Sequence, residues 1–182
     1  MAHLKARRAP KPLNEQTLNE LALRYVGRFA TTRAKLGAYL SRKLRERGWE
    51  GAGRPDPERI VERIAELGYV DDAGYALSKS RSLTGRGYGK QRVVQAMRVA
   101  GVDESDSEAA RDFAEAQAVT AALRFAEKRR LGPYAEREVA DPKERQKSVA
   151  SMVRAGHGFE LARKIVGMRP GEDVESINLG ER

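Results

Sequence analysis

The chain has 182 residues, a formal net charge of +9, no cysteine and two histidines. The absence of cysteine excludes a disulfide framework, a thiolate metal site and a cysteine nucleophile. Because His3 and His157 lie at opposite ends of the chain, no multi-histidine metal site is expected. No apolar run approaches the ~18 residues of a membrane span, and the N-terminus lacks the apolar core of a secretory signal. We therefore expect a cytoplasmic protein.

The positive charge is concentrated in the first half of the chain. Residues 1–100 hold 21 Lys and Arg against 10 Asp and Glu, whereas residues 101–182 hold 14 against 16. Of the 35 basic residues 25 are Arg, whose planar guanidinium suits bidentate contacts with phosphate and carboxylate. A basic half indicates a polyanionic partner such as nucleic acid or a nucleoprotein surface. Solubility alone is the alternative that the charge leaves open.

The first 70 residues predict a basic arm and three helices. Residues 1–13 carry two prolines and are predicted to be disordered. An apolar stripe then marks a helix that ends near Phe29, with Asn14 or Thr17 as its cap. A second helix begins near Thr31 or Thr32 and ends at Gly48. After a glycine-rich loop, Asp56-Pro57-Glu58 starts a third helix that Gly68 ends.

The helical pattern continues to about residue 169. Asp71 or Asp72 can cap a fourth helix, and glycines 85, 87 and 89 separate it from a fifth that ends at Gly101. One longer helix is predicted from Ser105 or Ser107 to about Arg129. Two further helices follow, starting at Asp141-Pro142 and at Phe159, and residues 170–182 form a loose tail. No segment alternates apolar and polar residues over strand length, so the predicted fold is all-α.

The breaks between helices suggest an internal repeat. In three places apolar residues four apart lead to a glycine and then to a bulky apolar residue, as in a helix that ends in a left-handed glycine cap. The period of roughly 55 residues accommodates three helices, and short helices bury a face only by stacking. We predict three tandem three-helix repeats over residues 14–70, 71–130 and 131–169. An ordinary helical bundle with coincidental caps is the alternative.

The motifs that resemble catalytic sites have simpler interpretations. The segment 85–90 is rich in glycine but lacks the Walker spacing and a preceding strand, so it predicts an inter-helix loop. Asp71 and Asp72 have no histidine or third carboxylate nearby and are interpreted as a helix cap. We interpret His157 as a surface or turn residue. Trp49 is predicted to plug the end of the second helix rather than to stack on bases.

The second predicted helix is the best candidate for a functional surface. It holds six basic residues and one acid in fifteen positions, more than solubility requires. A second group flanks the glycine loop near a helix start, where an anionic group can bind. The candidate contacts for a filament or nucleic acid are Arg33, Lys35, Arg42, Lys43, Arg45 and Arg47, followed by Arg86, Lys90 and Arg92.

Several segments of the chain together resemble the RecX family of bacterial recombinase regulators. The resemblance is clear over residues 14–102 and weaker over 103–182, where Gly158-Phe159 and Ile165 carry it. The segments of the clear part are Leu23–Val26, Thr32–Leu36, Leu44–Trp49, Leu67–Asp72 with Tyr75-Ala76, and Gly87–Val93 leading to Met97 and Gly101-Val102.

The resemblance implies three-helix repeats in an elongated, curved arrangement. It also implies a non-enzymatic regulator without a cofactor, which binds the RecA recombinase, mostly as the RecA–DNA filament. Family members lie in the filament groove and mostly inhibit its ATPase, strand exchange and coprotease activities in DNA repair and recombination. We expect a monomer with no membrane partner, and DNA phosphates are possible further contacts.

Two alternatives stay open at this point. One is a helix-turn-helix DNA-binding transcription regulator, for which Gln91 and Gln95 are the only candidate base contacts. The other is an RNA- or ribosome-associated protein, which the basic character allows.

Overall fold

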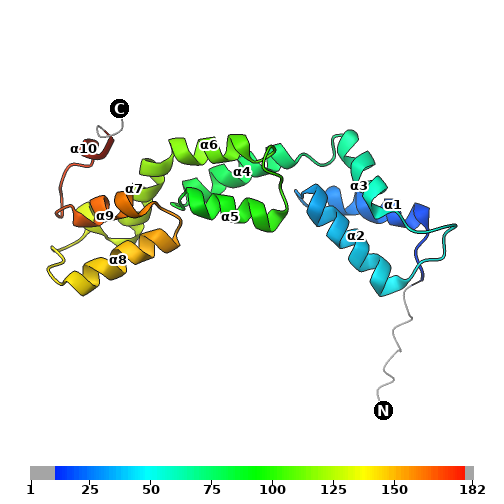
Figure 1. Cartoon of the computed structure of the whole chain (residues 1–182), viewed down its shortest axis with the longest axis horizontal. Helices are drawn as coiled ribbons and strands as arrows, with labels where there is room; N and C mark the ends of the chain where they lie inside the picture. Colours follow the sequence, from blue (N-terminus) through cyan, green and yellow to red (C-terminus); the bar gives the residue numbers. More distant parts are fainter. Residues whose placement is uncertain (1–10, 179–182) are drawn as a thin grey trace, which may run out of the picture. The chain divides into compact units, whose positions relative to one another are not determined.

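The computed structural model describes residues 11–178, and in this range the chain is helical (Figure 1). There is no strand between these residues, only an isolated bridge between Leu13 and Trp49. The predicted all-α class is confirmed. None of the helices described is both long and apolar enough to cross a membrane. The helices are α1 (Glu15–Val26), α2 (Arg33–Arg47), α3 (Pro57–Glu66), α4 (Asp72–Gly85), α5 (Lys90–Ala100), α6 (Glu108–Ala116), α7 (Ala118–Arg129), α8 (Pro142–Arg154), α9 (Phe159–Gly167) and α10 (Glu175–Asn178), with a 3-10 turn η1 (Gly132–Tyr134).

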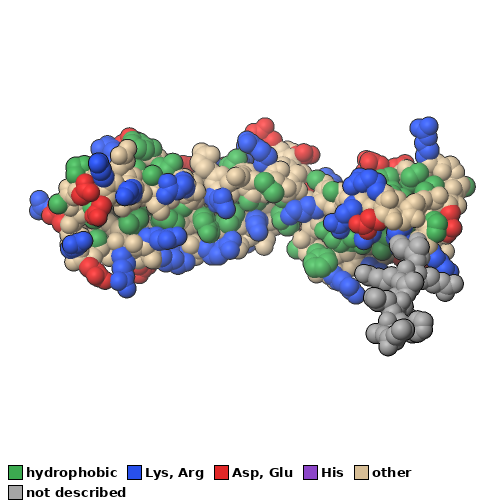
Figure 2. Space-filling model, turned by 90° about the horizontal axis from the view of Figure 1, so that it is seen from below, with side chains coloured by type: hydrophobic (Ala, Val, Ile, Leu, Met, Phe, Trp, Pro, Cys, Tyr) green, Lys and Arg blue, Asp and Glu red, His purple; other side chains and the backbone are tan. Residues whose placement is uncertain are grey.

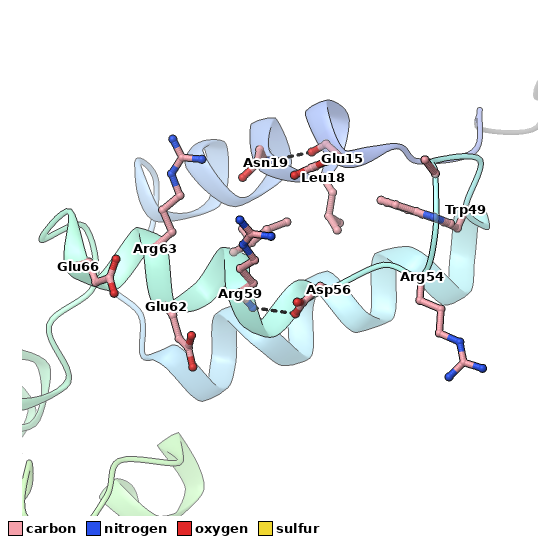
Figure 3. A pocket seen from close by; sticks show the side chains of 12 residues that line it. Glu15, Leu18, Asn19, Trp49, Arg54, Asp56, Arg59, Glu62, Arg63 and Glu66 are labelled. Carbon is pink, nitrogen blue, oxygen red and sulfur yellow. Dashed lines mark hydrogen bonds between the residues drawn. The ribbon is translucent and has the colours of Figure 1, made fainter.

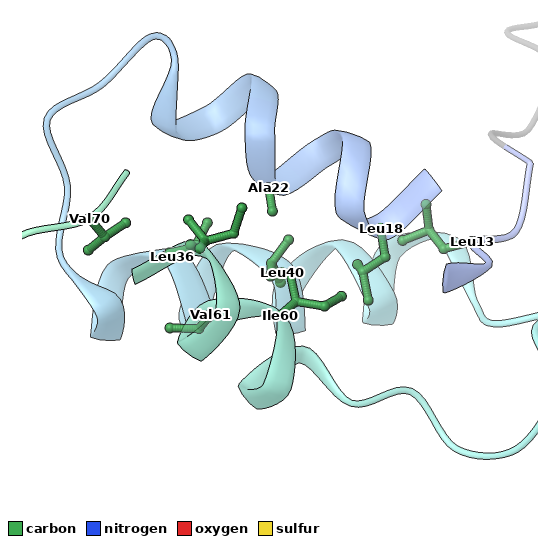
Figure 4. Close-up of a cluster of buried hydrophobic side chains, with 9 residues drawn as sticks. Leu13, Leu18, Ala22, Leu36, Leu40, Ile60, Val61 and Val70 are labelled. Carbon is green, nitrogen blue, oxygen red and sulfur yellow. The ribbon is translucent and has the colours of Figure 1, made fainter. Parts of the chain in front are cut away.

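The chain divides into two compact units, residues 1–71 and 72–182. In the first unit, α1, α2 and α3 enclose one apolar core whose central side chains are shown in Figure 4. Leu18, Leu36 and Leu40 are fully buried there, and Ile60 and Ile64 of α3 close the third side. Each helix supplies one apolar stripe, so none of the three could bury its stripe alone.

Side-chain caps fix where these helices begin. Asn14 caps α1 through a capping box with Thr17, which decides between the two predicted caps. The Thr32 hydroxyl accepts a hydrogen bond from the Lys35 amide at 3.2 Å. The Asp56 carboxylate accepts one from the Arg59 amide at 3.0 Å, directly before a proline in the first turn of α3. Such caps satisfy amides that have no partner inside the helix.

The predicted disordered arm is wrong at its last residue. Leu13 is fully buried in the first unit's core. Its amide donates to the Gly48 carbonyl at 3.0 Å, and its carbonyl accepts from the Glu50 amide at 2.8 Å. An apolar side chain with paired backbone groups holds this segment, although Pro12 precedes it. Residues 1–10 of the arm lie outside the described residues.

Trp49 has the structural role predicted for it. Its half-buried ring packs against the core of the first unit, and its Nε1 donates to the Gly53 carbonyl at 3.0 Å. The ring also occupies the space that a side chain at position 51 would need, since a Cβ on Gly51 would lie 2.5 Å from it. The glycine-rich loop therefore wraps around the indole.

The second unit contains two separate apolar clusters. Val93 and Met97 lie in the cluster formed by α4, α5 and α6, and Phe125, Met152 and Ile165 lie in the one formed by α7, α8 and α9. With the core of the first unit, the described chain has three clusters, each surrounded by three helices. The division into three tandem repeats stays a prediction.

The predicted long helix between residues 105 and 129 is wrong, because the chain breaks at Gln117 into α6 and α7. The buried alanines of α6, at 110 and 114, face the first cluster. Those of α7, at 122 and 126, face the second. The two stripes are in phase along the sequence, so periodicity alone indicates one continuous helix. The bend lets each half pack against a different set of helices.

The predicted loose tail is also wrong over part of its length. Ile177 of α10 is buried in the cluster of α7, α8 and α9. The Gly171 amide donates to the Pro133 carbonyl at 2.8 Å, which ties the start of this segment to η1. Residues 179–182 of the predicted tail lie outside the described residues.

Candidate interaction surfaces

The basic residues of α2 do not share one face of the helix. Leu36 and Leu40 mark the buried side. Arg42 and Arg45 are exposed, whereas Lys43 and Arg47 are half-buried at the edges of the core. Nearer the start of the helix, Arg33 is exposed and Lys35 is half-buried. Arg42 and Arg45 therefore form the outward part of the predicted surface.

Glu46, the single acid of α2, binds two of these cations. Lys43 Nζ lies 2.6 Å from its carboxylate and Arg42 Nε lies 3.6 Å from it. The hydrogen bond from Lys43 lowers the pKa of Glu46 below its usual value, and the positive charges around it act in the same direction. Partial neutralisation by Glu46 leaves Arg45 as the outward cation of α2 without a carboxylate partner among the residues described.

Arg47 has a structural contact. Its Nε donates to the Lys11 carbonyl at 2.8 Å, across 36 positions of the sequence. This bond fixes the segment that carries buried Leu13. Arg47 therefore contributes to the fold of the first unit as well as to its charge.

An aromatic group lies beside the cations of α2. The rings of Tyr25 and Tyr39 stack with centroids 4.3 Å apart, and Phe29 packs at 5.4 Å from Tyr25. The Arg42 guanidinium lies 5.7 Å from the Tyr39 centroid, within the range of a cation–π contact. Phe29 is 58% exposed. An exposed aromatic beside oriented arginines is typical of contact surfaces. The sequence stripe placed Phe29 in the helix but did not show its exposure.

A groove in the first unit lies between α1 and α3 (Figure 3). Its volume is about 710 Å³, and it is open to solvent. Leu18 and Ile60 form an apolar part, while acidic and basic side chains line the rest in similar numbers. The described residues include no group of three or more His, Asp or Glu that could hold a metal ion. The groove therefore has mixed charge and no arrangement specific to one ligand.

The second group of predicted contacts is split by the structure. The guanidinium groups of Arg86 and Arg92 lie 5.5 and 5.8 Å from the centroid of the same Tyr88 ring. Lys90, which stands between them in the sequence, instead forms an ion pair with Glu115 of α6 at 2.7 Å. Arg86 and Arg92 thus share a site, and Lys90 is paired elsewhere.

The glycine loop before α5 packs directly against the turn between α8 and α9. The Gly89 amide donates to the Ala155 carbonyl at 3.0 Å, and the Gln91 amide donates to the Gly156 carbonyl at 3.1 Å. A Cβ on Gly89 would lie 2.3 Å from the Gly156 oxygen, so only glycine permits this approach. The sequence predicted the loop correctly, but its glycines serve a backbone contact within the second unit.

His157 is buried in this contact, so its prediction as a surface residue is wrong. Its side chain is 4% exposed and packs against the Phe125 ring. Since a carbonyl only accepts, Nε2 carries the proton and donates to the Gly87 oxygen at 3.0 Å. Burial lowers the pKa of His157 below its ordinary value of 6.5, and the bond to Gly87 opposes this in part. The flanking glycines remove the side chains that would otherwise keep this turn at the surface.

Two further cations that the sequence analysis missed lie near the same loop. Arg124 Nη1 donates to the Gly85 carbonyl at 3.2 Å, and Lys128 Nζ donates to the Arg86 carbonyl at 3.1 Å. Both belong to α7, about 40 positions away in the sequence. Only the packing of α7 against the end of α4 brings them there. Figure 2 shows that Lys and Arg side chains are spread over both units on the face drawn, with Asp and Glu among them.

Known proteins resemble this chain along most of its length. A protein named regulatory protein RecX from Agrobacterium fabrum is 31% identical over 150 residues, which cover 80% of this chain and 79% of that protein. The chain belongs to the RecX family. Regulatory protein RecX from Myxococcus xanthus is 28% identical over 171 residues, covering 88% of this chain and 90% of that protein. No family model matches the sequence.

Solved structures show that the helical fold is that of RecX proteins. The crystal structure of RecX from Lactobacillus salivarius superposes with a TM-score of 0.61 at 17% identity, over 90% of this chain and 96% of that one. A second crystal structure of a regulatory protein RecX gives a TM-score of 0.62 at 22% identity, over 82% and 70%. At these identities the likeness concerns the fold.

Proposed function

We propose that this RecX family protein is a non-enzymatic regulator that binds the RecA recombinase, chiefly as the RecA–DNA filament. Bound in the filament groove, it inhibits the ATPase, strand exchange and coprotease activities in cytoplasmic DNA repair and recombination. The observation that carries the proposal is the match to a regulatory protein RecX over four fifths of the chain. The comparisons do not favour the alternative of a helix-turn-helix transcription regulator.

The outward part of α2 supports a contact with an acidic assembly. Arg42 and Arg45 are exposed, and Arg42 is held in place by Glu46 and by the Tyr39 ring. Phe29, exposed near the same aromatic stack, adds an apolar contact. Oriented guanidinium groups beside an exposed aromatic provide charge complementarity and an apolar anchor together. In our proposal this surface meets acidic side chains of the filament and hinders the movements between protomers that ATP hydrolysis requires.

Charge reversal on α2 tests this surface. The double variant Arg42→Glu/Arg45→Glu is expected to bind RecA assembled on single-stranded DNA at least about tenfold more weakly, because repulsion replaces attraction at two contacts. Arg47 is left unchanged, since it anchors the Lys11 carbonyl. Co-sedimentation of each protein with the filaments measures the affinity.

The matched control carries the same charge change on another helix of the same unit. Arg59 and Arg63 are exposed on α3, so Arg59→Glu/Arg63→Glu also removes four positive charges overall. Circular dichroism melts establish that both variants are folded. Equal filament binding by the α2 variant and the α3 control would contradict the assignment of the contact to α2.

A further inference from the structure

Four cations of the second unit gather around the C-terminal end of α4. Arg86 follows α4, Arg92 lies on α5, and Arg124 and Lys128 lie on α7. None of the four forms an ion pair with a carboxylate among the described residues. By contrast Lys90, on the same helix as Arg92, is paired with Glu115. The group, which we call the α4-end cluster, therefore carries positive charge that the protein does not neutralise.

Backbone carbonyls hold two members of the α4-end cluster. Arg124 Nη1 lies 3.4 Å from the Thr84 oxygen and 3.2 Å from the Gly85 oxygen. Lys128 Nζ lies 3.1 Å from the Arg86 oxygen. The end of a helix carries about half a negative charge, which is much less than the positive charge gathered around it. These bonds fix the two side chains without cancelling their charge.

The other two members are positioned by one aromatic ring. Both guanidinium groups, of Arg86 and Arg92, lie within 6 Å of the Tyr88 centroid. Arg86 Nε also donates to the Ser82 carbonyl at 3.3 Å, and Arg92 Nη1 donates to Gln95 Oε1 at 3.1 Å. Both residues are exposed. A guanidinium has five N–H donors, so several stay available for the oxygens of an anion.

Few acidic residues belong to the helices that carry the cluster. Helix α5 has none, and α7 has only Glu127. The single acid of α4, Asp72, stands at its opposite end. The loop that carries Arg86 is further held by its backbone contact with the turn at Gly156. The cluster is thus a fixed group of cations on a rigid support.

We propose that the α4-end cluster binds the phosphodiester backbone of single-stranded DNA directly. Four cations from three elements suit a ligand with regularly spaced phosphates, and arginines favour bidentate phosphate contacts. Tyr88 is half-buried between its two arginines, so it positions them and does not stack on bases. The contact goes beyond the proposed function because it requires no RecA, and it predicts affinity without sequence preference.

The test uses the full-length protein and a fluorescein-labelled oligothymidylate. Fluorescence anisotropy measures binding between about 50 and 200 mM salt, the range over which phosphate contacts weaken strongly. In the variant Arg86→Glu/Arg92→Glu, we expect at least a tenfold loss of affinity and a salt slope lower by about two, one for each lost phosphate contact. Arg124 and Lys128 stay in place, because they cap α4.

The control Arg163→Glu/Lys164→Glu makes the same charge change on α9 of the same unit, where both residues are exposed. It should keep the slope of the unaltered protein. Equal slopes in the two variants, or absence of DNA binding by the unaltered protein at the lowest salt, would overturn the proposal. So would polyglutamate that displaces the oligonucleotide as well as unlabelled DNA does, since the cluster would then recognise carboxylates.

Failure here is distinct from failure of the proposed function. A protein that sediments with RecA filaments, but whose DNA binding is insensitive to Arg86 and Arg92, refutes only the α4-end cluster. A protein that binds the oligonucleotide as expected, but not the filament, refutes only the proposed function.

Discussion

At the scale of single residues, His157 connects two turns that are far apart in the sequence. Its Nε2–H donates to the Gly87 carbonyl across 70 positions, and its ring lies against Phe125. Protonation at Nδ1 would place a charge in this buried contact without a partner for it. The structure therefore favours the neutral imidazole.

The stability of the second unit should consequently depend on pH. Because burial lowers the pKa of His157 in the folded chain below 6.5, the unfolded chain takes up the proton first as the pH falls. The stabilisation is complete above pH 6.5 and decreases from there down to the folded-state pKa. Melting temperatures measured at steps from about pH 7.5 to 5 should show this decline.

The variant His157→Gln isolates this effect. Its amide can still donate to the Gly87 carbonyl, but it does not titrate. We expect the decline between pH 6.5 and 5 to become shallower in the variant. If both proteins lose the same number of degrees over this interval, another group is responsible.

The roles of individual cations were only partly predictable. Exposure of Arg42 and Arg45 follows from the helical period, which places them opposite Leu36 and Leu40. The pairing of Lys90 with Glu115 depends on how α5 packs against α6, which local spacing does not encode. The same holds for Arg124 and Lys128, which reach the end of α4 only through the packing of α7.

At the scale of elements, local signals identified the helix ends well and the helix packing poorly. Thr32 and Asp56 cap α2 and α3 as predicted, and Gly101 ends α5 in the left-handed conformation. These signals act through neighbouring backbone groups, so the sequence contains them. The break at Gln117 results from competition between two clusters for α6 and α7, which no local signal announces.

The close approach of two turns in the second unit gives a direct test at this scale. Gly89→Ala is expected to reduce the free energy of unfolding by about 1–3 kcal/mol, the usual cost of forcing an extra group into a packed site. The added Cβ would meet the Gly156 oxygen at 2.3 Å. Urea denaturation followed by circular dichroism measures the change.

Gly85→Ala serves as the matched control, because no atom lies within 4 Å of a Cβ at this position of α4. It should leave the midpoint unchanged or raise it slightly, since alanine restricts the unfolded chain. A Gly89 variant as stable as the Gly85 variant would show that the two turns can separate at little cost.

At the scale of the whole molecule, the chain consists of two compact helical units with cationic surfaces held in defined geometry. In the first unit the oriented cations lie beside an aromatic stack. In the second they surround the end of one helix. Both arrangements suit contacts with an acidic assembly, in keeping with membership of a family whose proteins are named as regulators.

The measurement that tests the central claim most directly is the rate of ATP hydrolysis by RecA on single-stranded DNA as this protein is added. The account predicts that the rate falls as the filaments become occupied, as judged by co-sedimentation at the same concentrations. An unchanged rate on filaments saturated with the protein, or on filaments that it fails to bind, would contradict the account.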